Sequence, residues 1–257
     1  MQSLRSGVRA VIFDLSGTVI DYRSRGPVIA FVELFEKHGV AVTEVEARRP
    51  MGLHKRDHVA SMLRDPAVAT RWSEVHGKEP GESDVEKLYL EFPEIQVRAL
   101  RQHCEVLPGV AEVTAALRLR MIPFAATTGF DRAMMAEMIP AVQAQGFAPE
   151  IFMTPDQVGG VGRPAPWMAF AAARHMNVYP MRTIVKVGDT EADVAEAANA
   201  GMWCVAVTDT GNEAELGSEV AGRKFGELGA HYVIDSVADL LPVIDALDER
   251  ISKGEKP

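Results

Sequence analysis

Short apolar runs bounded by Gly, Pro, Asp or Thr recur along most of the chain. Their sequences are VRAVIFD, IPFAATTG, EIFMTPD, TIVKVGD, WCVAVTD and HYVIDS, at positions 8–14, 122–129, 150–156, 183–189, 203–209 and 231–236. Runs of this length that are rich in β-branched residues are typical of strands buried on both faces of a sheet. We therefore predict six buried strands.

Amphipathic patterns with a period near 3.6 residues lie between these runs. They cover positions 109–120, 131–145, 164–176 and 191–201. Strands that alternate with helices form parallel sheets, because each helix carries the chain back to the same edge. The pattern predicts an α/β fold with a doubly wound, mostly parallel sheet.

One long interval breaks the alternation. Between Ser24 and His103 only helical patterns occur, around positions 27–39, 51–63 and 84–100. We predict an all-helical cap domain at 24–103, inserted into an α/β core made of 1–23 and 104–257. A cap inserted after the first strand can close over the carboxyl ends of the strands, where ligands of such sheets bind.

A lysine interrupts the apolar pattern of the second helical segment. If the helix spans 51–63, Met51, Lys55, His58, Val59 and Met62 share one face. A lysine on an apolar face either extends its amine to water or is buried for a chemical purpose. The pattern alone favours the first reading.

Composition narrows the classes of partner. The chain has 257 residues, 47% of them hydrophobic, and its 27 basic and 36 acidic residues give a formal net charge of −9. It has no dense basic run for nucleic acid, no long apolar segment for a membrane and no leader pattern. The two cysteines lack metal-ligand spacing and favour a reducing compartment. We expect a cytoplasmic protein.

Carboxylates follow two of the predicted strands. Asp14 ends the first run, Asp189 ends the fourth, and Asp193 follows four residues later at the start of a helix. Side chains at the carboxyl ends of parallel strands meet in one crevice. Together with a ligand phosphate, such carboxylates offer the oxygen ligands that Mg²⁺ prefers.

The same crevice is expected to receive a hydroxyl group and a cation. Thr128 ends the second run, and Arg163 precedes a helix that begins at a proline. A guanidinium group can hold phosphoryl oxygens while the threonine donates a further hydrogen bond. These residues predict a phosphoryl-transfer site.

This set of motifs resembles the haloacid dehalogenase superfamily. The DLSGT motif containing Asp14 looks like its nucleophile motif, Thr128 and Arg163 like its second and third motifs, and GDTEAD like its acidic motif. Within the superfamily the longer stretches GTVIDYRSRGP, PMGLHKRDH, TTGFDRAMM, GRPAPWM and VGDTEADVAEAANAGMW resemble the phosphonoacetaldehyde hydrolases, also called phosphonatases. The resemblance spans the chain.

The resemblance implies a role for this lysine. Lys55 looks like the lysine that forms a Schiff base with the substrate aldehyde in that family, and His58 is expected to shuttle protons for the imine steps. A free lysine has a pKa of about 10.4. We expect burial beside Met51 and Val59, and the neighbouring cation Arg56, to lower the Lys55 pKa.

The resemblance also implies the remaining roles. Asp14 is the expected nucleophile, and Ser16, Met51, Thr128 and Arg163 are expected at the substrate. Mg²⁺ is expected on Asp14, the backbone carbonyl of Ser16 and Asp189, with Asp193 supporting its water shell. The family forms homodimers through its cap, and the segment IAFVELF at 29–35 is a candidate contact.

Two positions depart from the family pattern and leave alternatives open. Phosphatases of the superfamily carry an acid two residues after the nucleophile, where this chain has Ser16 and phosphonatases often have Ala. Phe130 stands where that family often has Tyr. Hydrolysis of phosphonoacetaldehyde is the leading hypothesis. The alternatives are a superfamily phosphatase, a hydrolase of a related phosphonate, and a non-catalytic protein that binds a phosphonate.

Overall fold

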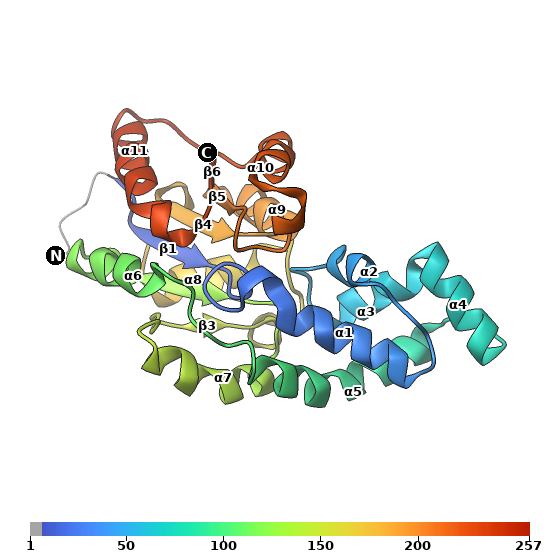
Figure 1. Ribbon diagram of the computed structural model, residues 1–257. Helices are drawn as coiled ribbons and strands as arrows, with labels where there is room; N and C mark the ends of the chain where they lie inside the picture. Colours follow the sequence, from blue (N-terminus) through green and yellow to red (C-terminus); the bar gives the residue numbers. More distant parts are fainter. Residues whose placement is uncertain (1–6) are drawn as a thin grey trace.

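The computed structural model describes residues 7–257, so the first six residues of the predicted core segment 1–23 lie outside the described residues. Its six strands form one parallel sheet in the order β3-β2-β1-β4-β5-β6 (Figure 1). The strands are β1 (Ala10–Phe13), β2 (Phe124–Thr127), β3 (Phe152–Met153), β4 (Ile184–Gly188), β5 (Trp203–Val207) and β6 (Tyr232–Ile234). All six predicted strands are confirmed, as is the doubly wound fold.

Helices cover both faces of the sheet because successive side chains in β1 point to opposite sides. Val11 and Phe13 belong to the larger apolar cluster, whereas Ala10 and Ile12 belong to the smaller one. The larger cluster includes residues of α6 (Val110–Leu119), α7 (Arg132–Ala144) and α11 (Leu240–Ser252). The smaller includes residues of α8 (Trp167–His175), α9 (Glu191–Ala200) and α10 (Ser218–Glu227).

The interval predicted to lack strands contains five helices and no strand in the described structure. They are α1 (Arg25–Lys37), α2 (Glu44–Arg48), α3 (Lys55–Arg64), α4 (Pro66–His76) and α5 (Glu82–Leu100). Helices α1 and α5 lie side by side and lead outward from the sheet to α4 (Figure 1). We call α1–α5 the cap helices.

A stack of three rings joins the cap helices. The Phe31 ring on α1 stacks on the His58 ring of α3 at 3.7 Å and on the Phe92 ring of α5 at 4.3 Å between centroids. All three side chains are fully buried. These contacts fix α3 relative to α1 and α5, and with it the lysine at the start of α3.

The predicted helix at 51–63 is wrong at its start. Helix α3 begins at Lys55, and Met51 lies in the preceding turn. Gly52 in this turn has φ +88°, which a helix cannot contain, and a Cβ there would lie 2.3 Å from Thr190 Oγ1. The turn therefore packs closely against the core, and Met51 is buried without belonging to the helical face.

The chain enters the cap through a strained segment. Asp21, Arg23 and Ser24 all have φ between 51° and 61°, which non-glycine residues rarely adopt. The Arg23 N–H group donates to Thr210 O at 2.7 Å, and the Asp21 carboxylate accepts from the Gly26 N–H group at 3.1 Å. These bonds hold the entry to the cap in one conformation.

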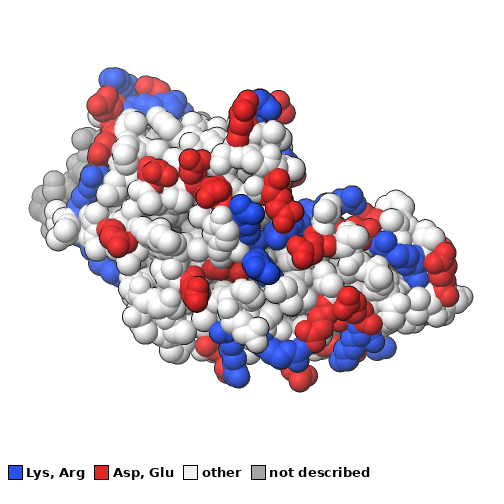
Figure 2. Space-filling view, in the orientation of Figure 1, with Lys and Arg blue, Asp and Glu red and all other residues white. Residues whose placement is uncertain are grey.

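The surface carries both signs of charge. On the face shown in Figure 2, Lys and Arg side chains are interspersed with Asp and Glu, and a basic group lies where the core meets the cap helices. Within residues 7–257, no helix has both the length and the apolar character needed to cross a bilayer.

Candidate active site

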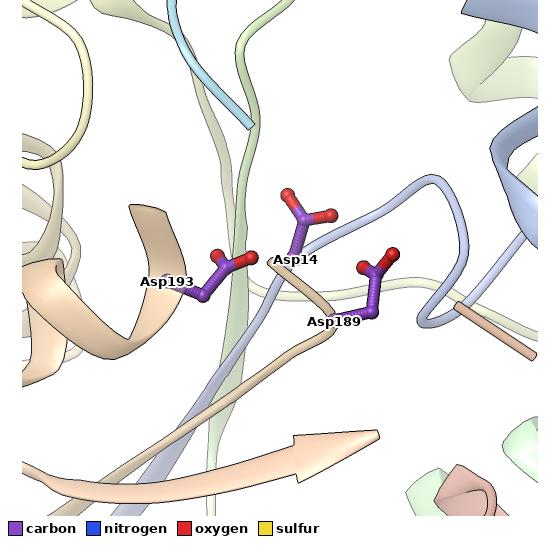
Figure 3. A group of neighbouring side chains, drawn as sticks. All are labelled: Asp14, Asp189 and Asp193. Carbon is purple, nitrogen blue, oxygen red and sulfur yellow. The ribbon is translucent and has the colours of Figure 1, made fainter. Parts of the chain in front are cut away.

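Three carboxylates meet at the carboxyl end of the sheet, as the sequence predicts. Asp14 directly follows β1, Asp189 directly follows β4, and Asp193 lies in the first turn of α9. Because β1 and β4 are neighbours, one oxygen of each carboxylate lies within 4.8 Å of the others (Figure 3). All three side chains are buried. The site lies where strand order reverses, a common ligand position in such sheets.

Asp189 is held by the loops around it. Its carboxylate accepts a hydrogen bond from Thr18 Oγ1 at 2.7 Å and another from the Asn212 N–H group at 2.7 Å. Gly17 has φ +85°, and a Cβ there would lie 2.3 Å from the Asp189 carboxylate. Only glycine therefore allows the loop after Asp14 to approach Asp189 so closely.

Asp193 performs a structural and an electrostatic task at once. One carboxylate oxygen accepts from Thr190 Oγ1 at 2.6 Å, forming a capping box at the start of α9. The other oxygen pairs with Arg163 and with Lys186 Nζ, the latter at 3.0 Å. Burial acts to raise the pKa of Asp193, but these two cations outweigh it and the pKa falls to about 2.

Arg163 lies between two of the carboxylates. Its guanidinium donates to Asp14 at 2.5 Å and also to Asp193, and the side chain is buried. Burial acts to lower the Arg163 pKa, yet the charges of Asp14 and Asp193 outweigh it and raise the pKa. The structure thus places Arg163, the third predicted motif, in contact with Asp14 of the first motif and Asp193 of the acidic motif.

Lys186 and Glu196 extend this network, and the sequence analysis missed both. Lys186 Nζ lies 2.9 Å from Glu196, and it donates to Thr127 Oγ1 at 2.7 Å. Both charged side chains are fully buried. The available signal was a lysine inside the apolar run IVKVG, the same kind of anomaly that marks Lys55.

This network also separates the two threonines at the end of β2. The Thr127 hydroxyl accepts a hydrogen bond from Lys186 and lies 3.5 Å from the Glu196 carboxylate. Thr128 has no such ionic partner among the described residues; its hydroxyl accepts from the Phe130 N–H group at 3.2 Å, and its side chain is buried at the strand end. The surroundings favour Thr128 over Thr127 as the hydroxyl that faces a ligand.

The donor set fits a hard divalent cation. The buried group contains four carboxylates, of Asp14, Asp189, Asp193 and Glu196, but only two permanent cations. Burial, followed by the charges of Asp14 and Asp193, raises the pKa of Asp189 well above its usual value. A divalent cation would relieve this repulsion, and carboxylate oxygens are suitable ligands for it.

Lys55 approaches the site from the cap. It is the first residue of α3, and its Nζ atom lies 4.7 Å from the centre of the Phe130 ring and 5.6 Å from that of Phe31. The side chain is 4% exposed, so the lysine does not extend into solvent. Burial lowers its pKa to about 7, which the charge of Asp14 opposes and that of Arg163 reinforces.

One expected cause of this pKa was wrong. Arg56 lies at the surface, where its guanidinium pairs with Glu82 and with Glu86, the latter at 2.6 Å. The cation that lowers the Lys55 pKa is Arg163. Adjacent residues at the start of a helix project in different directions, and this separates Arg56 from Lys55.

His58 is fully buried among the cap helices. Its Nε2–H group donates to Ala47 O at 2.9 Å, and its Nδ1 atom has no hydrogen-bond partner among the described residues. Burial and the Lys55 charge lower its pKa well below the usual value, so the ring is neutral. Its role as a proton shuttle stays a prediction.

Ser16 lies partly buried in the loop that follows Asp14.

A further missed residue connects the acidic site to the cap. Besides holding Asp189 through its backbone, Asn212 accepts a hydrogen bond from Arg48 Nη1 at 3.3 Å and donates one to Arg48 O at 3.2 Å. Arg48 also donates to Arg23 O at 2.7 Å in the strained entry segment. Cap, entry segment and acidic site thus share one hydrogen-bond network.

Comparison with known proteins agrees with this site. Residues 8–201 match the family model of the haloacid dehalogenase-like hydrolases. The chain is 39% identical to the phosphonoacetaldehyde hydrolase of Nitratidesulfovibrio vulgaris, over 97% of this chain and 94% of that protein. It is 42% identical to that of Bacillus cytotoxicus, over 95% of this chain and 97% of that one.

Solved structures show the same relationship. A phosphonoacetaldehyde hydrolase-like protein from Oleispira antarctica has a TM-score of 0.95 at 37% identity, with 100% of this chain and 99% of that chain covered. The β-phosphoglucomutase of Clostridium difficile, 17% identical with a TM-score of 0.73, shares the fold. The chain is a hydrolase of the haloacid dehalogenase superfamily and belongs to its phosphonoacetaldehyde hydrolase family.

Proposed function

We propose that this protein hydrolyses the carbon–phosphorus bond of phosphonoacetaldehyde to acetaldehyde and phosphate. One observation carries the proposal. The Lys55 amine is buried, burial lowers its pKa to about 7, and it lies close enough to Asp14 and Arg163 for both charges to act on that pKa. A neutral amine above a carboxylate is the pair that breaking a carbon–phosphorus bond requires, because carbon needs an electron acceptor and phosphorus a nucleophile.

The first step forms the electron acceptor. The neutral Lys55 amine attacks the aldehyde carbon, the carbonyl oxygen takes one proton from the amine and one from the solvent and leaves as water, and a protonated imine remains. A lysine pKa of about 7 leaves half of the amine unprotonated at neutral pH, compared with under a tenth of a per cent for a free lysine. Burial therefore raises the reactive fraction roughly a thousandfold.

The second step transfers the phosphoryl group. An oxygen of Asp14 attacks phosphorus, the carbon–phosphorus bond breaks, and its electron pair forms the enamine as the imine nitrogen accepts the π electrons. The enamine is then protonated on carbon and hydrolysed to acetaldehyde and free Lys55. Water cleaves the aspartyl phosphate and releases phosphate.

The other predicted residues support this sequence. Arg163 and Thr128 hold phosphoryl oxygens, and Met51 lines the closed pocket. Asp14, the Ser16 carbonyl and Asp189 would hold Mg²⁺, with Asp193 supporting its water shell, and the ion would supply positive charge that screens the phosphonate from the attacking carboxylate. If His58 moves a proton, it does so through Nδ1, because Nε2–H is bonded to Ala47 O.

Ser16 favours this reaction over ester hydrolysis. A serine hydroxyl cannot protonate an alcohol leaving group at neutral pH. An enamine needs no such acid, because the imine nitrogen accepts the electrons. The absence of an acidic side chain at this position is therefore consistent with carbon–phosphorus cleavage.

We extend the proposal to the organisation of the chain. Residues 24–103 serve as a lid over a core of 1–23 and 104–257, and two copies pair through their caps. Within IAFVELF, Phe31, Leu34 and Phe35 are buried inside the chain, which leaves Ile29, 38% exposed, and Val32 for a partner. The cytoplasmic location, and the absence of nucleic-acid and membrane partners, stay predictions.

Trapping of the imine tests the function directly. The protein is incubated with phosphonoacetaldehyde, Mg²⁺ and borohydride, and the modified residue is identified by mass spectrometry. We expect a reduced adduct on Lys55 and, without borohydride, phosphate release that Lys55→Ala abolishes. The exposed Lys87 on α5 provides the matched control, because Lys87→Ala should change neither result.

The alternatives predict different results. Phosphate release from sugar phosphates that survives Lys55→Ala would identify an ordinary phosphatase. Turnover of another phosphonate with the same adduct would identify a related hydrolase. Thermal stabilisation by phosphonoacetaldehyde in Mg²⁺, with neither adduct nor phosphate, would identify a phosphonate-binding protein and contradict the proposal.

A further inference from the structure

Two aromatic side chains surround the Lys55 amine, one from each part of the chain. Phe130 belongs to the loop after β2 and is 2% exposed; Phe31 belongs to α1 of the cap and is fully buried. The ring centroids lie 4.7 Å and 5.6 Å from Lys55 Nζ, both within cation–π range. Among residues 7–257, no hydrogen bond or ion pair joins the Lys55 amine to an acceptor.

Phe130 is the more important of the two rings. Both faces of Phe31 are already covered, because parallel rings at 3.7 Å and 4.3 Å cannot lie on the same side. The Phe31 ring is therefore crowded by two neighbours, and the amine lies farther from its centroid, at 5.6 Å. Phe130 has no stacked partner among the described residues, and it is closer to Nζ.

A neutral ring suits a nitrogen that changes its charge during a reaction. A carboxylate beside Lys55 would hold it as an ammonium ion, as Glu196 and Asp193 hold Lys186. Such a carboxylate would also pair with a cationic intermediate on the Lys55 nitrogen, and the pairing would make that intermediate a weaker electron acceptor. The negative face of an aromatic ring stabilises a cation about 2- to 30-fold, which is too little to keep the amine protonated.

We propose that the face of Phe130 stabilises the positive charge on the Lys55 nitrogen, first as the ammonium ion and then as the protonated imine. Phe130 is thereby a catalytic residue that acts through its ring and needs no hydroxyl group. The part that concerns the imine rests on the proposed function. The part that concerns the ammonium ion does not.

Fluorinated phenylalanines test the proposal without changing the shape of the site. Mono-, di- and trifluorophenylalanine at position 130 progressively weaken the negative face of the ring. The protonation of Lys55 is followed by the ¹³C shift of its Cε atom, assigned with Lys55→Arg. We expect the Lys55 pKa to fall stepwise along the series, with about a tenfold change in the protonation constant at trifluorophenylalanine.

Turnover of phosphonoacetaldehyde provides the second measurement. It is made at pH 9, where the Lys55 amine is unprotonated, so that the rate reports the cation formed during the reaction. We expect kcat to fall about tenfold over the series and Phe130→Tyr, which retains the ring, to keep kcat within about threefold. The same series at Phe147, a buried core ring that contacts the rings of Phe13, Phe124 and Phe152, should change neither quantity.

The two measurements distinguish the proposals. A stepwise fall in the Lys55 pKa without any carbon–phosphorus cleavage would support the ring contact and contradict the proposed function. Cleavage with a Lys55 pKa and kcat that do not respond to fluorination at position 130 would overturn the role of Phe130 and leave the function intact. Equal responses at Phe130 and Phe147 would also overturn it.

Discussion

Lys55 and Lys186 are two buried lysines with opposite electrostatics. They are 4% and 0% exposed, so both lose nearly all contact with water. Around Lys55 lie two aromatic rings, and burial lowers its pKa to about 7. Around Lys186 lie Glu196 and Asp193, whose charges outweigh the effect of burial and raise its pKa. Partners, and not burial alone, decide whether a buried lysine stays charged.

The two lysines therefore have different tasks in the core and in the cap. In the core, Lys186 is a permanent cation that holds Asp193 beside Arg163, so the acidic site keeps its geometry. In the cap, Lys55 has no ionic partner among the described residues, and its lowered pKa favours the neutral amine that the proposed mechanism needs. One lysine thus contributes fixed charge and the other reactivity. Replacing each lysine by an apolar residue of similar length separates these two contributions.

Lys55→Met should have the largest effect on activity and almost none on folding. In the proposed mechanism no imine can form without the amine, so we expect carbon–phosphorus cleavage to fall at least about 10⁴-fold, as for other enzymes that lose their nucleophile. The free energy of unfolding should be unchanged or higher, because a neutral side chain replaces a poorly solvated cation. Steady-state phosphate release and urea unfolding measure the two. A loss of stability above about 1 kcal/mol would contradict the electrostatic account of Lys55.

Lys186→Met, unlike Lys55→Met, should strongly lower the free energy of unfolding. Removing this cation leaves Glu196 and Asp193 buried with one cation fewer, and breaking such a buried pair costs about 3–5 kcal/mol. Urea unfolding of Lys186→Met and of Lys186→Met/Glu196→Leu provides the measurement. The double variant should recover part of the loss, since it also removes a buried carboxylate. A double variant less stable than the single one would show that Glu196 has another essential partner.

The pH dependence of stability tests the lowered Lys55 pKa. The folded protein releases the Lys55 proton near pH 7, whereas the unfolded chain retains it to about pH 10.5, so the unfolded state binds more protons between these values. Stability from this residue therefore increases as pH rises through this window, by about 2 kcal/mol between pH 7 and pH 9. The difference in unfolding free energy between the wild type and Lys55→Met isolates it. A flat difference would mean that Lys55 has an ordinary pKa.

The sequence predicts those features of the fold and of the site that follow from hydrophobic periodicity and from the order of the strands along the chain. Buried parallel strands have continuous apolar runs, and the ends of neighbouring strands meet, so the six strands and the convergence of Asp14 with Asp189 could be predicted. The start of α3 could not, because the positive φ of Gly52 depends on contact with the core. The network around Lys186 was equally hidden. A lysine in a strand gives no sign of which carboxylate, distant in sequence, will meet it.

Asn212→Ala should have the smallest effect, and it should act on the cap rather than on the chemistry. The substitution removes both side-chain hydrogen bonds to Arg48 but keeps the backbone N–H group that holds Asp189. Losing these bonds costs about 1 kcal/mol, and in the proposed lid mechanism this raises the population of the open cap roughly fivefold. Proteolysis near the strained entry segment should therefore accelerate by that factor, while the Mg²⁺ concentration for half-maximal activity stays unchanged. Gln143→Ala, at an exposed position of α7, provides the control for proteolysis. In the proposed lid mechanism Lys55 reaches the core only when the cap is closed, so a faster-opening cap that still supports full kcat would show that closure does not limit the reaction.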